Sequence, residues 1–189
     1  MKILKILLGI LVVLVAVAFI LSLVGPKDYR VERSQEINAS AAAVYEQVAY
    51  FNNWSAWSSW AEMDPSAEYT VIGEDGKVGT KQSWKGDKSG EGSMEILEAL
   101  PNEVVSHKLV FTAPWESEAR TKFLIEALDS THSKLTWIMT GKNETKMSRL
   151  MGAVMPMDKM IGKDFERGLF KLDSVLQANK EQTPTEITE

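Results

Sequence analysis

The sequence predicts an α+β protein in which a curved antiparallel sheet of about seven strands wraps around a long C-terminal helix, preceded by an N-terminal transmembrane helix. Three observations support this prediction. An uncharged apolar run occupies the start of the chain, short alternating segments fill its middle, and an amphipathic stripe lies near its end. Alternation with a period of two indicates half-buried strands, whereas an apolar repeat every three or four residues indicates a helix.

The length and composition leave room for one globular domain beyond the apolar run. The chain has 189 residues, a formal net charge of -5 and no cysteine. A remainder of about 160 residues buries roughly 70% of its unfolded surface, so no disulfide is needed. The absence of cysteine also excludes thiolate metal sites and thiol catalysis. Basic residues are scattered among acidic ones, so we expect no nucleic-acid partner.

The segment Ile6 to Gly25 has the length and composition of a membrane span. It contains 20 residues without a charge, and a helix needs about 20 apolar residues to cross a bilayer. A cleaved signal peptide is the competing interpretation, because Ala16-Val17-Ala18 matches a cleavage site. The apolar run continues to Val24, however, which is longer than the apolar region of a signal peptide. We therefore expect an uncleaved single-pass anchor in the cell membrane.

Charges beside the span give a small preference for its orientation. Lys2 and Lys5 precede it, whereas Lys27, Arg30 and Arg33 follow it. Acidic residues count for little in the positive-inside rule, so the two flanks nearly balance. A short N-terminal tail inside the cell, with the domain on the extracytoplasmic side, is the preferred arrangement.

The first elements after the span are a strand and a short helix. Residues Tyr29 to Ile37 form the predicted first strand, and Asn38 or Ser40 caps a helix that begins near Ala41. Apolar residues at helical spacing face the core of the domain. They are Val44, Val48 and Phe51.

A tryptophan-rich corner follows this helix. Half of the six tryptophans lie at a spacing of three, at Trp54, Trp57 and Trp60, shortly before Asp64-Pro65. Large indole rings are costly to leave in water, so this corner must pack on the sheet or line a pocket.

Short strands separated by turns occupy the middle of the chain. Glu74-Asp75-Gly76, Lys85-Gly86-Asp87 and Pro101-Asn102 are the predicted turns. A strand begins near Tyr69, and five more are Thr80–Trp84, Ser93–Leu100, Val104–Thr112, Ala119–Leu128 and Lys134–Thr140. In the last three strands every second residue belongs to one inward face, as expected of a sheet that is covered on one side. These residues are Val105, His107, Leu109, Phe111, Thr121, Phe123, Ile125, Ala127, Leu135, Trp137 and Met139.

The final predicted element is helical, from about Met147 to Ala178. Gly152, Pro156 and Gly162 interrupt its first part, which predicts two pieces or a kink. An apolar stripe then recurs every three or four residues. It consists of Ile161, Phe165, Leu169, Leu172 and Leu176. A helix laid across a curved sheet leaves space beneath it, so an internal cavity is expected.

Several short motifs recur in order between Tyr29 and Lys180. They are Trp54-x-x-Trp57-Ser58-x-Trp60 with Asp64-Pro65, then Gly79 and Trp84, then Leu135-Thr136-Trp137, and Gly162-x-Asp164-Phe165-Glu166-x-Gly168-Leu169-x-x-Leu172. Together they resemble the START-like superfamily, also called SRPBCC or polyketide cyclase/dehydrase-like, here in a membrane-anchored form. Members often carry Trp-Ser-Pro-Trp where this chain has Ser59, so a stiffening proline is absent.

The resemblance implies a helix-grip fold with a hydrophobic pocket between the sheet and the C-terminal helix. It implies no activity, because the superfamily includes carriers, receptors and cyclases and shares no catalytic residues. We expect binding of a small hydrophobic or amphipathic, lipid-like molecule without a cofactor or metal. A cyclase- or dehydratase-type enzyme that uses the same pocket and a partner-binding scaffold with a collapsed pocket are the alternatives.

Candidate ligand-binding residues are large inward-facing side chains. From the tryptophan corner and the sheet they are Trp57, Trp60, Trp84, His107, Leu109, Phe111, Phe123, Trp137 and Met139. From the C-terminal segment they are Met151, Met155, Phe165 and Leu169.

Methionine is concentrated just before the long helix, where five of the nine methionines fall between residues 147 and 160. Flexible thioethers suit an apolar surface that adapts to varied shapes, such as a movable pocket entrance. Gap-filling beside a kinked helix explains the cluster equally well, and contact with lipid is a third interpretation.

His107 is the only candidate for a catalytic base, although a buried histidine with a hydrogen-bonded partner is the commoner situation. His132 lies in a turn, and two separated histidines make a metal site improbable. Asp64 and Asp164 have capping and surface roles as sufficient explanations. No phosphate-binding loop or nucleophile elbow occurs in the sequence.

The chain is therefore divided into an anchor at residues 1–25, a linker at 26–28, a ligand-binding domain at 29–180 and a flexible tail at 181–189. The tail is polar and lacks an apolar pattern.

Overall fold

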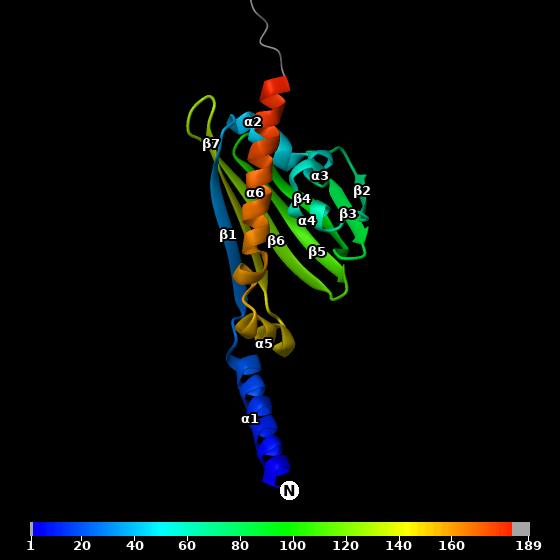
Figure 1. The fold of residues 1–189 in the computed structure, drawn as a ribbon. Coiled ribbons are helices and arrows are strands. Elements are labelled where there is room, and N and C mark those ends of the chain that lie inside the picture. The colour runs from blue at the N-terminus through cyan, green and yellow to red at the C-terminus, as the bar shows by residue number, and fades with distance from the viewer. Residues whose placement is uncertain (1, 183–189) are drawn as a thin grey trace, which may run out of the picture.

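The computed structural model describes residues 2–182. Helix α1 (Lys2–Val24) projects from one end of a folded domain (Figure 1). It is long and apolar enough to cross a membrane, and Ser22 is the one residue of this helix that is buried. A helix with this exposed apolar surface is a membrane anchor or a signal sequence.

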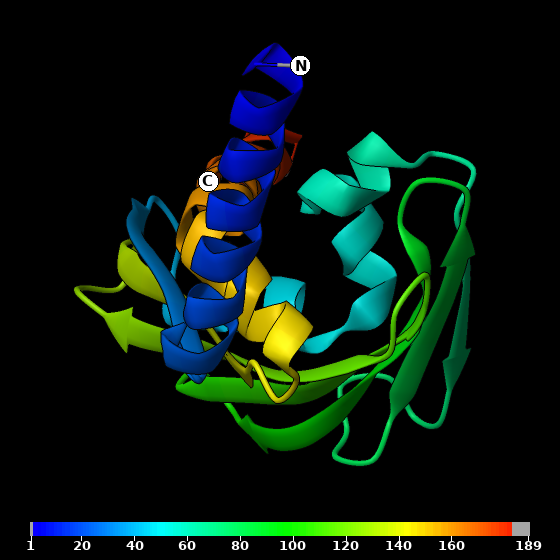
Figure 2. The ribbon, with the colours of Figure 1, turned by 90° about the horizontal axis from the view of Figure 1, so that it is seen from below.

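A single seven-stranded antiparallel sheet forms the body of the domain, with strand order β1-β7-β6-β5-β4-β3-β2. Its strands are β1 (Asp28–Ile37), β2 (Glu68–Ile72), β3 (Lys81–Gly86), β4 (Gly90–Leu100), β5 (Val104–Ala113), β6 (Ser117–Ala127) and β7 (Ser133–Lys142). The strands from β2 to β7 are joined in chain order, and β1 pairs with β7 at one edge. The sheet curves strongly around one side (Figure 2). The predicted architecture is confirmed.

The helices that follow α1 lie on the concave side of the sheet, except α5, which contacts α1. They are α2 (Ala41–Ala49), the 3₁₀ turn η1 (Phe51–Asn53), α3 (Trp54–Trp57), α4 (Ser59–Met63), α5 (Lys146–Val154) and α6 (Met157–Gln182). Of the two predicted caps for α2, Ser40 is the one used, and its hydroxyl accepts a hydrogen bond from the Ala43 backbone N–H at 3.3 Å. Helix α6 crosses the sheet beside β1 (Figure 1).

The C-terminal helical segment consists of two helices, as expected, but only one of the predicted interruptions separates them. The chain breaks at Met155 and Pro156, between α5 and α6. Gly152 and Gly162 lie inside helices. Gly162 instead provides space, because a Cβ atom there would collide with the guanidinium of Arg33.

Two boundaries and the burial of one residue differ from the sequence prediction. Asp28 already pairs with Lys142, so Gly25, Pro26 and Lys27 connect α1 to the sheet. Helix α6 continues to Gln182, two residues into the predicted tail. Residues 183–189, the rest of that tail, lie outside the described residues. Ala127 is exposed, since it ends β6 beyond the part of the sheet that the helices cover.

Ion pairs hold α6 against the rest of the domain. The Arg33 guanidinium lies 2.7 Å from a carboxylate oxygen of Asp158 and 2.6 Å from one of Glu166. Arg167 and Lys171 both pair with Glu62 of α4 and hold the pKa of its carboxyl at about 2. Exposed pairs contribute little stability each. Their distribution along α6 favours one position of the helix over the sheet.

Candidate ligand-binding cavity

A cavity of about 840 Å³ lies between the concave face of the sheet and the helices α3, α4 and α6. Strands β2 to β7 all contribute side chains to its wall, and β1 contributes Tyr29. This volume falls in the range of about 300–1,000 Å³ that is typical of small-molecule sites. The collapsed pocket expected of a scaffold protein is therefore not found.

More than half of the candidate ligand-binding residues line this cavity. They are Trp60, Trp84, Leu109, Phe111, Trp137, Met139 and Phe165. The strands bring their members together because the inward positions of neighbouring antiparallel strands share one face. Phe165 reaches the cavity from α6, and its ring stacks on Trp137 with the ring centroids 4.0 Å apart.

Four other candidates belong to the solid core and do not line the cavity. Trp57, His107, Phe123 and Leu169 are each at most 1% exposed. The Phe123 ring lies edge-on to Trp57 and tilted against Trp137, with centroids 6.1 and 4.9 Å away. Helix α2 contacts this part of the sheet, and Trp54 of α3 packs edge-on against His107 and Phe123.

Met151 and Met155 also differ from the prediction. Both are exposed and lie on or just after α5, outside the cavity. The break before α6 turns α5 away from the sheet toward the end of α1. Met157, the first residue of α6, lines the cavity instead.

His107 does not have the surroundings of a catalytic base. It is fully buried, and neither ring nitrogen has a hydrogen-bond partner within residues 2–182. The surrounding rings include Phe51 and Trp54, whose centroids lie 5.5 and 5.4 Å away. Burial lowers the pKa of His107 to about 3. A general base near neutrality needs access to substrate and a matched pKa, and His107 has neither.

The tryptophan corner is packed inward. Trp54 and Trp57 are buried, and their indole N–H groups each donate to a backbone carbonyl of α2, Val48 and Gln47, at 3.2 Å. The exposed apolar patch expected of a scaffold protein is absent from these two residues. Ser59 donates its hydroxyl to the Asp164 carbonyl at 3.0 Å and so links the corner to α6.

Asp64 has a structural role that explains the Asp-Pro motif. One of its carboxylate oxygens accepts hydrogen bonds from the backbone N–H groups of Lys88 and Ser89, both at 2.8 Å. These and further hydroxyl contacts lower the pKa of the Asp64 carboxyl. A Cβ atom at Gly86 would collide with this carboxylate, so glycine allows the β3–β4 turn to close over it.

The cavity wall carries almost no available charge. Its ionisable groups are Asp75 and the phenols of Tyr29 and Tyr69, and burial raises the pKa of both tyrosines. The Asp75 carboxylate accepts backbone N–H groups of Phe51 and Asn52 at 2.9 and 3.0 Å. Within residues 2–182 no group of three potential ligands could hold a metal ion. The wall therefore suits a neutral, largely apolar molecule.

Several polar side chains on the wall make no hydrogen bond within residues 2–182, and Gln82 carries the largest polar group among the buried ones. Gln82 is 6% exposed, and its side-chain amide makes no hydrogen bond within the described part of the chain. Gln82 is not among the candidate residues predicted from the sequence. The period of two on its strand was the available signal, because Gln82 shares a face with Trp84. Other wall residues that the prediction missed include Tyr29, Val71, Met94 and Ile161.

Comparisons with known proteins support the fold. No family model and no curated protein sequence matches the chain. A Thalictrum norcoclaurine synthase mutant, solved with a transition-state analogue, is 12% identical with a TM-score of 0.60; the match covers 81% of this chain and 96% of the synthase. Ara h 8.0201 is 12% identical with a TM-score of 0.55, over 80% of this chain and 99% of its own. The di-domain ARO/CYC protein BexL is 14% identical with a TM-score of 0.58, over 78% of this chain and 46% of its own.

This chain shares the helix-grip fold of these solved proteins. The resemblance seen in the sequence motifs is thereby confirmed for the architecture. At these identities the likeness concerns the helix-grip fold alone, and the activities of the related proteins remain their own.

Proposed function

We propose that this protein binds one small, neutral, apolar or amphipathic molecule in the cavity between the sheet and α6. The observation that carries the proposal is the 840 Å³ cavity with an aromatic and aliphatic wall. Burial of apolar ligand surface contributes about 25 cal/mol per Å². A charged ligand would lose its hydration without meeting an available opposite charge, which disfavours it strongly.

Gln82 supplies the polar part of this proposal. Its side-chain amide borders the cavity and has both donor and acceptor capacity, and neither is used within the described residues. A ligand hydroxyl or carbonyl group at this point gives the amide a hydrogen-bond partner inside the cavity. The ligand is therefore an apolar molecule that carries at least one neutral hydrogen-bonding group.

Native mass spectrometry of the full-length protein, released from detergent micelles, tests the proposal. The expected result is a discrete bound mass of a neutral organic molecule that disappears after organic extraction. Leu109→Trp places an indole in the cavity and should lower occupancy at least tenfold, about 1.4 kcal/mol. Leu100→Trp makes the same change at an exposed residue outside the cavity wall and should leave occupancy unchanged.

A second series identifies the result that contradicts the proposal. Neutral probes such as N-phenyl-1-naphthylamine and long-chain alcohols are added to the extracted protein. If no probe binds, or if Leu109→Trp binds as well as the wild-type protein, the cavity is not a binding site.

The proposal includes attachment to the cell membrane through Ile6 to Gly25, with the domain on the extracytoplasmic side. The exposed apolar surface of α1 supports the attachment. Retention of the protein in membranes after an alkaline wash tests the anchor. Digestion of the domain by protease added to intact spheroplasts tests the side; protection from the protease contradicts it.

A further inference from the structure

Helix α5 lies against the end of α1 from which the domain begins. The Lys146 ammonium is 6.0 Å from the centroid of the Phe19 ring. A Cβ atom at Gly25 would collide with the Arg149 carbonyl oxygen, so the two backbones approach closely. Ser22, on the same part of α1, is buried, and Ala18 and Leu21 beside it are half-buried, whereas the rest of the described helix is exposed. The two helices are therefore packed together rather than loosely connected.

This packing determines the level of α5 relative to a bilayer. If Ile6 to Gly25 spans the hydrocarbon core, Phe19 lies about 9 Å below Gly25, six residues at 1.5 Å per residue. The first turn of α5 is beside Phe19. Helix α5 then has to lie within the boundary between headgroups and hydrocarbon, because its partner on α1 is itself inside the membrane.

The exposed side chains of α5 suit that position. Met147, Met151 and Val154 recur at helical spacing and are exposed, with Met147 at 65%. Thr145 and Ser148 form a capping box that stabilises the start of this short helix. A surface helix with one large apolar face and basic residues beside it is typical of helices that lie in a membrane interface.

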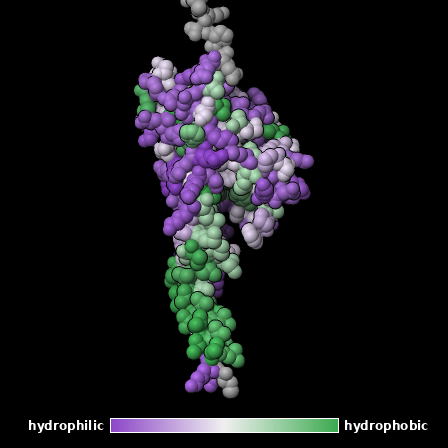
Figure 3. Space-filling model, viewed as in Figure 1, coloured by the Kyte–Doolittle hydropathy of each residue, from purple (hydrophilic) through white to green (hydrophobic). Residues whose placement is uncertain are grey.

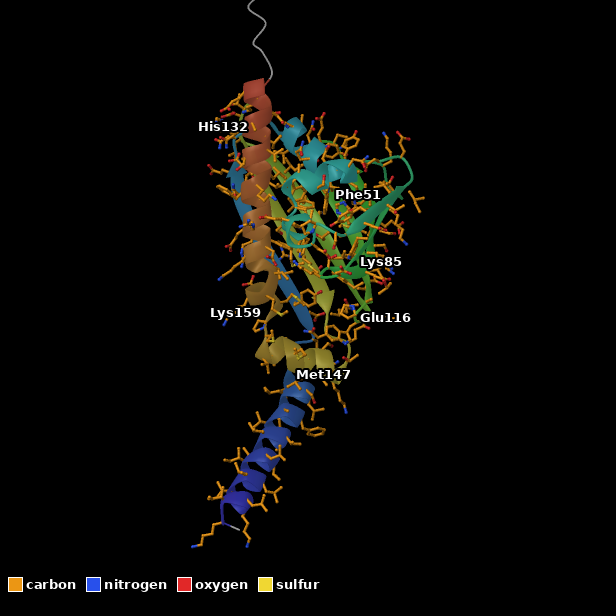
Figure 4. The ribbon with its side chains drawn as sticks, turned by 45° about the vertical axis from the view of Figure 1, so that its right-hand side comes forward. Phe51, Lys85, Glu116, His132, Met147 and Lys159 are labelled. Atoms are coloured by element: carbon orange, nitrogen blue, oxygen red, sulfur yellow. The ribbon has the colours of Figure 1, made fainter. Side chains whose placement is uncertain are left out.

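A second exposed apolar group lies at the same end of the domain. Tyr29 pairs with Gly141, which pairs with Ala119, so the loop before β6 lies at the level where α1 joins the sheet. Trp115 in that loop is 80% exposed. Figure 4 shows its neighbour Glu116 and Met147 toward the end from which α1 projects. Tryptophan is enriched at the interface between membrane and water.

The cavity also reaches this end of the domain. Tyr29 and Ser117 begin strands there, Met157 begins α6, and Ile161 follows one turn later; all four line the cavity. Figure 2 views the domain from the side of α1, with the concave face of the sheet visible beside α5 and α6. In Figure 3 the apolar surface of α1 continues without interruption onto the lower end of the domain.

We infer that α5 and the Trp115 loop form an interfacial face that rests on the lipid bilayer crossed by α1, so that the mouth of the cavity opens onto the membrane surface. This inference rests on the proposed anchor and cavity. A ligand that dissolves in lipid then moves between bilayer and cavity without crossing bulk water.

Single-cysteine labelling of the full-length protein tests the inference, because the chain has no cysteine of its own. Cysteine replaces Trp115 or Met147 on the interfacial face, Val15 within α1, or Phe170, which is exposed on α6. Each variant carries a nitrobenzoxadiazole label and is reconstituted into vesicles of phosphatidylcholine and phosphatidylglycerol. Lipids with a doxyl group near the headgroup then quench labels that touch the interface.

The expected result is blue-shifted emission and quenching at Trp115→Cys and Met147→Cys, with no quenching at Phe170→Cys. Blue-shifted emission at Val15→Cys shows that the anchor has inserted. If Val15→Cys is inserted while the labels at positions 115 and 147 behave like the label at 170, the interfacial face is refuted and the anchor stands. If Val15→Cys emits as in water, both the anchor and the inference are overturned, whereas ligand binding measured by mass spectrometry is unaffected.

Discussion

Strand β5 passes through two regions that differ in packing although they share one face of the sheet. Val105 and His107 lie in the packed region, where no part of either side chain is exposed. Leu109 and Phe111 follow on the same face and line the cavity. The difference arises above the sheet, because α2 and α3 press on the first part of β5, whereas the second part faces empty space. Burial at a strand position therefore depends on the element opposite as much as on the residue.

The packed region, around His107, lies beside the hollow region, which is the part of the sheet that lines the cavity. Phe51, Trp54, Trp57 and Phe123 form a continuous cluster whose neighbouring ring centroids are no more than 6.1 Å apart. Edge-to-face aromatic pairs add about 0.5–1.5 kcal/mol beyond burial. The cluster borders the cavity through Phe51 and Trp54, and further aromatic pairs such as that of Trp137 and Phe165 lie in the cavity wall itself.

The largest expected effect is a loss of folding stability, which should differ between the two regions when the same Phe→Ala substitution is made in each. Phe123→Ala should lower the free energy of unfolding by about 3–5 kcal/mol, because it removes a ring that is enclosed on all sides. Phe111→Ala should cost less than half as much, about 1–2 kcal/mol, because one side of that ring faces the cavity. Urea unfolding of both full-length variants in one detergent measures the difference. Equal losses would mean that the two regions are packed alike.

A smaller effect concerns the response of the packed region to pH. Burial lowers the pKa of His107 to about 3 in the folded protein, whereas an unfolded histidine has a pKa near 6.5. The stabilising contribution of neutral His107 is complete above about pH 6.5 and is lost as the pH falls toward 3. Between pH 7 and pH 5 the free energy of unfolding should fall by about 2 kcal/mol.

His107→Leu serves as the control for this prediction, because leucine fills a similar volume and has no group that takes up a proton. Urea unfolding at pH 7 and pH 5 should show a much smaller fall for the variant. Carboxyls with lowered pKa values, such as those of Glu62 and Asp129, act below this window. A wild-type protein with the same stability at both pH values contradicts the burial of a neutral histidine.

The smallest expected effect is a decrease in ligand affinity after a substitution in the hollow region. Gln82→Met keeps an unbranched side chain of similar size but removes the amide. We expect about fivefold weaker binding of the extracted ligand, because one neutral hydrogen bond contributes about 1 kcal/mol. The free energy of unfolding without ligand should stay the same or rise. Unchanged affinity, measured by titration of the ligand-free protein, would exclude Gln82 from ligand recognition.

Much of the fold could be predicted because each element buries one face and therefore has a local period. The alternation in β5, β6 and β7 and the stripe that includes Phe165 and Leu169 both follow from that rule. The prediction that Gly162 interrupts the helix was wrong, because the role of this residue does not follow from a local period. Its role depends on Arg33, a residue far away in the sequence that occupies the space above it.

The sequence by itself determined the apolar span, the order of the strands and helices, and which residues of each element face inward. Only the tertiary structure decided that Trp57 and His107 are enclosed while Leu109 and Phe111 border a cavity, and that α5 packs on α1 instead of on the sheet. Local periodicity records which face of an element avoids water. It does not record how far apart two elements stay when they meet, and that distance is what separates a packed core from a binding cavity.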